Sequence, residues 1–310
     1  MGPWTRGNEL TSLVGVPPIV LADEANLLVS AATCAMRIES RPFGHSISMR
    51  PTDTAATATH NAIERDSVTA DCGPGKRVAV RPALTVIVPL YNERDHLAEI
   101  LSRVRAVDVE KEILMVDDAS TDGTAEMLRA EVDGRIEGVR VFYHATNLGK
   151  GASIRTALPH GRGQFTIIQD GDLEYDPEDY RAILDAFERE KVDVVYGSRF
   201  MHGWPPMKFA NRLVNRLLAW MVRVLFGAPM TDEATCYKAF RTEVIQSLPL
   251  TCRRFEFCPE VTAKLLRSGY RIAEVPIRYE ARSFAQGKKI RWTDGVAAIW
   301  TLLKFRFIRF

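Results

Sequence analysis

Near its middle the chain reads Thr166-Ile-Ile-Gln-Asp170-Gly-Asp172-Leu-Glu174-Tyr-Asp-Pro177. The β-branched run predicts a buried strand, and the chain turns polar where that strand ends. In an extended backbone alternate side chains share a side, so Asp170, Asp172 and Glu174 would point the same way. Carboxylates placed together repel one another unless a cation neutralises them, and a hard divalent ion that bridges phosphates suits oxygen ligands. The stretch therefore predicts a metal site. A plain acidic turn is the alternative, because Asp176-Pro177 also looks like the start of a helix.

Strand-like and helix-like segments alternate on both sides of this stretch. Besides the strand just described, we expect strands at 84–88, 112–116, 139–143 and 192–196. Helical periodicity between them predicts βαβ units, and hence an α/β fold with a mainly parallel central sheet flanked by helices. Ligands of such sheets bind beyond the carboxyl ends of the strands. Polar residues gather at those ends in this chain: Glu93, Asp117, Asp118, Asp170, Asp172 and Arg199.

The composition is that of an ordinary folded protein, 46% hydrophobic and 26% charged. A net charge of +2 is too small to indicate nucleic-acid binding. The five cysteines form neither a CxxC pair nor a metal-ligand spacing, which predicts a reduced, intracellular protein. No uninterrupted apolar run reaches membrane-spanning length.

Residues 1–80 have a different character from the rest of the chain. Ser, Thr, Ala, Pro and Asp dominate and no periodicity persists, so we expect a disordered N-terminal extension. We expect one domain over 81–310, with a nucleotide-binding part at 84–200 and an acceptor or membrane-surface part at 201–310.

The last third combines apolar helices with basic residues. The helix expected at 208–226 carries Lys208, Arg212 and Arg216 at four-residue steps, and a helix from Asp294 mixes aromatic and basic side chains. Apolar helices with a basic stripe are typical of proteins lying on an anionic membrane surface. The alternative is two core helices, each with one solvated face.

Four motifs occur in the order seen in inverting family 2 glycosyltransferases of the GT-A fold, which the chain from residue 84 onward resembles. They are Val86-Ile-Val-Pro-Leu-Tyr-Asn-Glu93, Val116-Asp-Asp-Ala-Ser-Thr-Asp-Gly-Thr124, Asn147-Leu-Gly-Lys-Gly151 and Asp170-Gly-Asp172. The tail looks most like the dolichol-phosphate mannose synthase, or polyprenyl-phosphate glycosyltransferase, branch. Its motifs are Gly197-Ser-Arg199, Thr231-Asp232, Phe255-Glu-Phe-Cys-Pro-Glu260 and Glu274-Val-Pro-Ile277.

The resemblance implies a role for each strand end. Pro89, Tyr91 and Glu93 would line the base and ribose, and Asp117 or Asp118 would hydrogen-bond the base. The metal, Mg²⁺ or Mn²⁺, would be held on the diphosphate of the sugar nucleotide by Asp170 and Asp172. Glu174 falls where related synthases often carry Gln, and it is the third candidate ligand.

Cations would hold the phosphates of donor or acceptor. Arg199 would act as a planar charged fork. Lys150 is a further nucleotide-binding candidate, although its turn lacks the Walker A spacing and needs no function of its own. The supply of cations for a lipid phosphate is Arg199, Arg212, Arg278, Arg282, Lys288 and Lys289.

The acceptor decides whether a base is needed. A lipid phosphate is already anionic near neutral pH, whereas a sugar hydroxyl would need a carboxylate base, and Asp232 or Glu233 stands where related enzymes place one. We expect metal-dependent inverting transfer, with GDP-mannose as the first donor to test, to a polyprenyl or dolichyl phosphate. The enzyme would be peripheral at the cytoplasmic face of a membrane, directly or through an anchored partner, with Asp172, Arg199 and Asp232 as catalytic residues. A hydroxyl acceptor, an idle nucleotide-binding scaffold and a nucleotidyltransferase are the alternatives.

Overall fold

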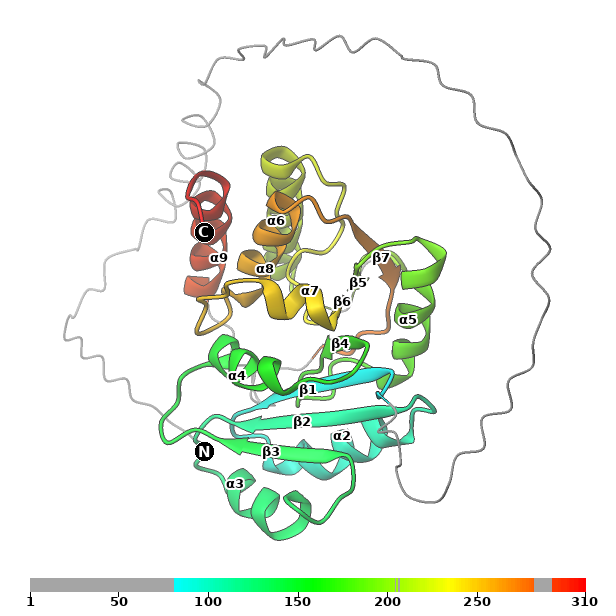
Figure 1. The fold of residues 1–310 in the computed structure, drawn as a ribbon. Helices are drawn as coiled ribbons and strands as arrows, with labels where there is room; N and C mark the ends of the chain where they lie inside the picture. The colour runs from blue at the N-terminus through cyan, green and yellow to red at the C-terminus, as the bar shows by residue number, and fades with distance from the viewer. Residues whose placement is uncertain (1–80, 204, 206, 282–291) are drawn as a thin grey trace, which may run out of the picture. The chain divides into compact units, whose positions relative to one another are not determined.

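The core of the protein is a sheet with the strand order β3-β2-β1-β4-β6-β5-β7 (Figure 1). The computed structural model describes residues 81–203, 205, 207–281 and 292–310, which all lie in one compact unit, 74–310. The predicted extension 1–80, Arg282, Lys288 and Lys289 lie outside the described residues. The strands are β1 (Leu84–Leu90), β2 (Lys111–Asp117), β3 (Val139–Tyr143), β4 (Phe165–Ile168), β5 (Val194–Ser198), β6 (Lys238–Arg241) and β7 (Ile272–Pro276).

The sheet is mainly parallel, which confirms the predicted α/β class. The strand pairs β1–β2, β1–β4, β2–β3 and β5–β7 are parallel. One strand, β6, runs antiparallel between β4 and β5. The sequence did not reveal this strand, because four residues with a lysine and an arginine at its ends show no strand pattern.

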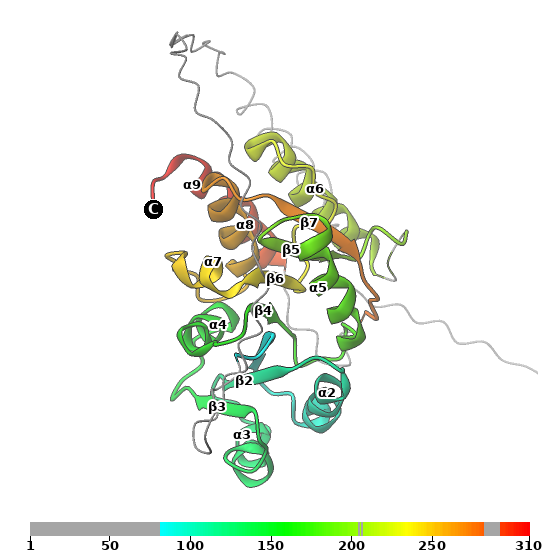
Figure 2. The same ribbon diagram turned by 45° about the vertical axis from the view of Figure 1, so that its right-hand side comes forward.

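Helices cover both faces of the sheet (Figures 1 and 2). One apolar cluster joins the sheet to α2 (Arg94–Ala106), η1 (Leu128–Val132) and α5 (Tyr180–Arg189). The other joins it to α4 (Lys150–Ala157), α6 (Phe209–Phe226), α7 (Thr242–Ser247), α8 (Phe257–Arg267) and α9 (Trp292–Phe307). Val86 and Val88 belong to the first cluster and Ile87 to the second, as expected for a strand buried on both faces. The remaining short helices are α3 (Thr124–Met127), η2 (Leu158–His160) and η3 (Pro177–Asp179).

Helix α2 shows how the apolar period sets the packing. Its buried residues are the four that the period predicts, Leu97, Ile100, Leu101 and Val104. Asp95 could have capped this helix by its residue type, but the helix begins at Arg94, so Asp95 lies in the first turn and Glu93 precedes the helix.

The antiparallel strand determines which loops reach the carboxyl edge of the sheet. Phe165 pairs with Arg241 and Ile167 with Ala239, so the start of β6 lies beside the end of β4. The residues before β6, 231–237, therefore lie at the same edge as the Asp170 turn that follows β4. A segment from the back third of the chain thus joins the predicted donor site.

Candidate active site

The loops that follow β1 and β2 are tied to each other. The backbone amide of Asn92 donates to Oγ of Ser120 at 2.9 Å, and the amide of Thr121 donates to Oδ1 of Asn92 at 2.8 Å. Asn92 and Ala119 both have positive φ, at 51° and 58°, a conformation that non-glycine residues seldom adopt. Such turns persist only where their surroundings fix them, so the two loops form a fixed edge.

Tyr91 and Glu93 lie on this edge, and Pro89 lies within β1. Tyr91 is half-buried and Glu93 is buried. The amide of Glu93 donates to Oγ1 of Thr124 at 3.1 Å, and its Oε2 lies 3.0 Å from Nδ1 of His96. Glu93 thus helps to fix the conformation of the loop after β1.

Asp117 keeps an acceptor atom for a ligand. Its side chain is buried, and its Oδ2 accepts a hydrogen bond from the amide of Ser120 at 3.3 Å. Its Oδ1 is also buried and has no hydrogen-bond partner in the described part of the chain. An unsatisfied buried carboxylate oxygen is costly, so this atom suits a donor group of a bound molecule, provided that the adjoining loops open to admit it.

Asp118 is engaged in building the loop at 147–149. Its Oδ1 accepts from the amide of Leu148 at 2.8 Å and its Oδ2 from the amide of Gly149 at 2.7 Å. Nδ1 of His144 lies 2.7 Å from Oδ1. Of the two neighbouring aspartates that the sequence offered for the base, Asp117 therefore has the free acceptor and Asp118 has a structural role.

The same loop brings Lys150 to the acids. Gly149 has φ of +95°, and a Cβ there would lie 2.5 Å from the carbonyl oxygen of Arg253, so the loop is closely packed. Nζ of Lys150 forms an ion pair with Oδ1 of Asp170 and lies 2.9 Å from Sγ of Cys236. Burial acts to lower the pKa of Lys150, but the attraction of Asp170, together with that of Cys236 and Cys258, raises the pKa well above its ordinary value. Lys150 is thus a fixed cation beside the predicted metal ligand.

The acidic residues lie in a turn, which corrects the premise of an extended backbone. Strand β4 ends at Ile168, two residues before Asp170, and Leu173 has φ of 61°. A Cβ at Gly171 would lie 2.5 Å from Cδ2 of Leu90, so a larger residue between the two aspartates would require the Leu90 side chain to shift. Oδ1 of Asp172 accepts from the amide of Glu174 at 3.2 Å. The alternation of side chains does not hold here.

The carboxylate of Glu174 is hydrogen-bonded to a tyrosine. Its Oε2 accepts a hydrogen bond from the hydroxyl of Tyr279 at 3.1 Å, and Tyr175 forms an isolated bridge with Tyr279. Across residues 81–203, 205, 207–281 and 292–310, no group of three His, Cys, Asp or Glu side chains is placed to hold a metal. Asp170 and Asp172 still offer the hard oxygen ligands that Mg²⁺ and Mn²⁺ prefer. Mg²⁺ is commonly bound by one or two carboxylates together with substrate phosphates.

A buried aromatic layer supports this turn. Tyr180 and Tyr237 both donate to Oε1 of Gln169, at 2.6 and 2.5 Å, and Tyr175 stacks on Tyr237 with ring centroids 4.7 Å apart. The sequence singled out neither Gln169 nor Tyr237. Their role depends on strands that only tertiary structure brings together.

Arg199 and Asp232 form a buried pair at the end of β5. Nε and Nη2 of Arg199 donate to the two carboxylate oxygens of Asp232 at 2.7 and 2.8 Å, and the amide of Arg199 donates to Oδ2 at 3.0 Å. Glu274 accepts from the amides of Thr231 and Asp232 at 2.7 and 2.9 Å. Both oxygens of Asp232 are thus occupied, which leaves it poorly placed to act as a general base.

Glu233 lies next to this pair and is fully buried. Oγ1 of Thr262 donates to its Oε1 at 3.3 Å, while its Oε2 has no partner among the described residues. Burial raises the pKa of Glu233 to about 7. The carboxyl is protected from solvent, so an acceptor hydroxyl could reach it only if the surrounding packing opened.

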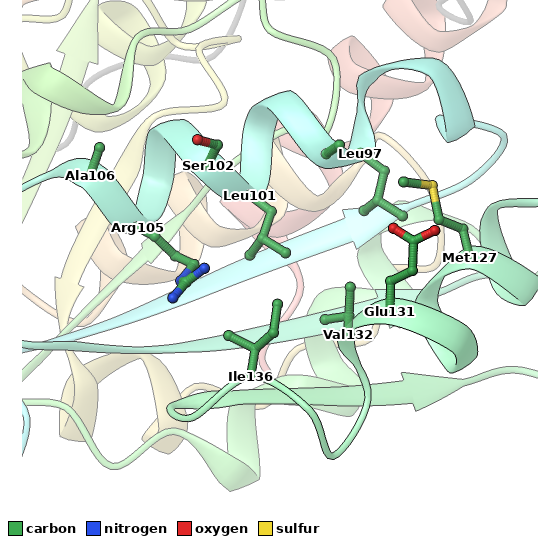
Figure 3. Close-up of a pocket in the computed structure, with 10 residues that line it drawn as sticks. Leu97, Leu101, Ser102, Arg105, Ala106, Met127, Glu131, Val132 and Ile136 are labelled. Carbon is green, nitrogen blue, oxygen red and sulfur yellow. The ribbon is translucent and has the colours of Figure 1, made fainter.

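Two further predicted residues and one hollow lie apart from these acids. Arg212 is in α6, and Arg278 pairs with Asp176 and Asp179 at 2.7 and 3.1 Å. A hollow of about 450 Å³ lies between α2 and η1 (Figure 3). Its lining includes Leu97, Leu101, Met127, Val132 and Ile136, together with Arg105 and Glu131. It contains none of the predicted site residues.

Comparison with known families places residues 85–248 in "Glycosyl transferase family 2", a match over just over half of the chain. The chain is 29% identical to the polyprenol monophosphomannose synthase of Mycolicibacterium smegmatis, covering 67% of this chain and 82% of that protein. It is also 29% identical to the undecaprenyl-phosphate mannosyltransferase of Micrococcus luteus, covering 71% of this chain and 97% of that protein.

A solved structure supports the fold. The crystal structure of glucosyl-3-phosphoglycerate synthase from Mycobacterium tuberculosis, in complex with Mn²⁺, UDP and glucosyl-3-phosphoglycerate, superposes with a TM-score of 0.56. It shares 18% sequence identity, and the match covers 74% of this chain and 81% of that one. The sheet and its covering helices are thus those of a known architecture, which confirms the predicted GT-A fold.

Proposed function

The chain belongs to glycosyltransferase family 2, and we propose that it transfers a sugar from a nucleoside-diphosphate sugar to a polyprenyl phosphate, with inversion at the anomeric carbon. Two relatives that match it over two thirds of its length are named for mannosyl transfer to such lipids. GDP-mannose is therefore the first donor to test. We propose that the sugar nucleotide binds at the carboxyl edge of β1, β2 and β4.

The donor would bind along this edge. Oδ1 of Asp117 would accept a hydrogen bond from the base, because it is the buried acceptor without a partner in the described part of the chain. Asp170 and Asp172 would hold a divalent cation on the diphosphate. Such a cation, when bound, would act as a Lewis acid and stabilise the departing nucleoside diphosphate. Lys150 would orient Asp170 through their ion pair.

Arg199 has a narrower role than the sequence suggested. Two of its nitrogens, Nε and Nη2, are engaged by Asp232, so any contact with a phosphate would come from another nitrogen of the guanidinium. We propose that the pair mainly holds the end of β5 and the 231–235 segment against the site. Its contribution to transfer would then be one of positioning.

The proposal of a lipid acceptor rests on one observation, which is that α6 and α9 each have a stripe of exposed apolar side chains. Phe209, Leu213, Trp220 and Val224 lie within about 60° of arc on α6. Arg216 and Arg223 border this stripe. Helix α9 presents its own exposed stripe of Trp292, Val296, Trp300 and Phe307. The two helices pack against each other, and both views show them side by side with α8 (Figures 1 and 2).

Exposed aromatic and basic side chains in such stripes suit an anionic membrane surface. None of the described helices is long and apolar enough to cross a bilayer. We propose that α6 and α9 lie on the membrane surface, at its cytoplasmic face, where a polyprenyl phosphate presents its head group. The lipid phosphate is anionic, so transfer to it would need no general base.

A hydroxyl acceptor is less well supported. Asp232 has both oxygens occupied by Arg199, and Glu233 is fully buried. Either residue could serve as a base only after a rearrangement that the lipid-phosphate reaction does not require. The polyprenyl phosphate is therefore the preferred acceptor.

A transfer assay tests the proposal. Purified full-length protein with Mg²⁺ or Mn²⁺ and a short polyprenyl phosphate is given GDP-mannose, UDP-glucose or UDP-N-acetylglucosamine, each radiolabelled. We expect one donor to give a product that is extractable into organic solvent and labile to mild acid. Release of free sugar without any lipid product would count against the lipid acceptor.

A further inference from the structure

The chain that leaves β7 pairs with the acid turn, which we define as residues 170–176. Tyr279 forms an isolated antiparallel bridge with Tyr175. The backbone amide of Glu280 donates to the carbonyl oxygen of Glu174 at 2.9 Å. Residues 279–280 are therefore a short antiparallel partner of the acid turn, although 105 positions separate Glu174 from Tyr279 in the sequence.

Arg278 anchors this pairing at one end. Its backbone amide donates to Oδ2 of Asp179 at 2.8 Å, and its Nε donates to Oδ1 at 3.1 Å. Its Nη1 lies 2.7 Å from Oδ2 of Asp176. The side chain of Arg278 is more than half exposed, so these ion pairs add little, and the backbone contact is the firmer one. Residues 278–280 thus all contact the segment 174–179.

The pairing reaches Asp172 through Glu174. The carbonyl oxygen of Glu174 accepts from Glu280, and the amide of Glu174 donates to Oδ1 of Asp172 at 3.2 Å. Leu173, between the two acids, has φ of 61°, a conformation that persists only where the surroundings fix it. A contact that holds Glu174 therefore also holds the carboxylate of Asp172.

Tyr279 adds the side-chain contacts. Its hydroxyl donates to Oε2 of Glu174 at 3.1 Å. Its ring centroid lies 5.5 Å from that of Tyr175 and 5.1 Å from Cζ of Arg199. Tyr279 thus joins the acid turn to the Arg199–Asp232 pair. No local sequence pattern indicates this position, because the partners of Tyr279 lie far from it in the sequence.

We propose that Tyr279 is a positioning residue, which holds Glu174 and thereby fixes the carboxylate of Asp172. The consequence for activity rests on the proposed function, in which Asp172 is a ligand of the divalent cation. Tyr279 would act on the reaction only through these two acids. Loss of a residue that orients metal ligands commonly lowers the affinity for the metal about 10- to 100-fold.

Hydrogen exchange tests the positioning itself. Tyr279→Phe removes the hydroxyl and keeps the ring, and Tyr270→Phe, at a half-buried tyrosine outside the site, is the matched control. Exchange in the full-length protein is followed by mass spectrometry in peptides that cover 170–178. We expect it to be about fivefold faster in Tyr279→Phe, the factor for one lost hydrogen bond, with peptides of β2 unchanged. Wild-type exchange in the acid turn of this variant would overturn the proposal.

The affinity for Mn²⁺ tests the consequence. Mn²⁺ is titrated into each protein with GDP or UDP present, and free Mn²⁺ is measured by its electron paramagnetic resonance signal. We expect the Kd to be about tenfold higher for Tyr279→Phe and unchanged for Tyr270→Phe. The Mn²⁺ concentration that gives half-maximal sugar transfer should rise by the same factor, which a smaller amount of folded enzyme would not cause.

The two measurements separate the possible failures. Faster exchange in the acid turn with an unchanged affinity for Mn²⁺ would refute the positioning of Asp172. If the wild type neither binds Mn²⁺ nor transfers sugar from any donor, the proposed function fails. The exchange measurement would still decide whether the hydroxyl of Tyr279 holds the acid turn.

Discussion

The front of the molecule, strands β1 to β4 and the loops that follow them, differs from the back, the chain from β5 onward, in the surroundings of its carboxylates. At the front, Asp170 and Asp172 lie in a partly exposed turn, and Asp117 keeps an oxygen without a partner in the described structure. At the back, Asp232 is enclosed by Arg199, and Glu260 is paired with Lys264 at 2.5 Å, with both side chains about 1% exposed. We propose a binding role for the carboxylates of the first region, whereas those of the second support the fold. The environment of a carboxylate separates the two roles better than its presence at a strand end.

The sharpest test of this contrast is Asp172→Ala. We expect sugar transfer to fall on the order of a thousandfold, because the substitution removes a ligand for the cation that stabilises the leaving group. The melting temperature should stay close to that of wild type, because Asp172 is at a turn on the surface of the site. Glu178→Ala, which changes an exposed acid in the same segment, is the matched control. Near-normal transfer by the Asp172 variant would remove Asp172 from the metal site.

At the back, Arg199→Ala should act on stability. It leaves Asp232 buried without its partner, and we expect a loss of about 3–5 kcal/mol in the free energy of unfolding. Arg189→Ala breaks an exposed pair with Glu190 and should cost less than about 1 kcal/mol. Denaturant unfolding measures both. Equal small losses would mean that Asp232 is not a supporting residue, and would reopen its role as a base.

The pH dependence of stability tests the burial of Glu233. Its pKa rises from the ordinary 4.5 to about 7 on folding, so the folded state binds the proton more tightly than the unfolded chain. The stability is therefore present below pH 4.5 and is lost as the pH rises through 7, by about 3 kcal/mol in all. Most of this loss falls between pH 5 and pH 8, and Glu233→Gln should remove it there. Glu243→Gln, at an exposed position of α7, should leave the wild-type loss unchanged.

The smallest expected effects concern the surface of α6 and α9. Trp220→Ser and Trp300→Ser should each weaken binding to vesicles of anionic lipids about tenfold, because each removes apolar area that the bilayer would bury. Met201→Ser removes an exposed apolar side chain outside these helices and should change little. Sedimentation with vesicles measures the binding. Unchanged binding, with a change in oligomeric state, would show that the face joins two copies of the chain.

Much of the front of the molecule could be predicted from the sequence, because its signals are local. The strand at 139–143 has the predicted bounds, and the buried face of α2 follows from its apolar period. Each strand is followed at once by the polar residues of its own loop. The positions of Asp117 and Asp170 at one edge thus follow from parallel pairing.

The back could not be predicted in the same way, because its contacts join distant residues. Lys238 is fully buried, and its ammonium lies 3.6 Å from the ring centroid of Tyr196, which no local pattern indicates for a lysine. The partners Arg199 and Asp232 are 33 positions apart, and their pairing depends on the place of β6 in the sheet. The roles of the individual site residues in transfer remain predictions.

The reversed strand β6 has a consequence for the order in which the protein can be completed. Strands β1, β2 and β3 pair with neighbours made earlier or soon after, whereas one side of β4 waits for β6, and β5 pairs with β6 and β7, which are synthesised later. Until residues 238–241 insert between β4 and β5, two sheet edges stay open to other chains. We therefore expect a nascent chain that stops short of residue 238 to hold its acid turn beside an unfinished edge. Such a chain would depend on chaperones until the last third of the protein arrives.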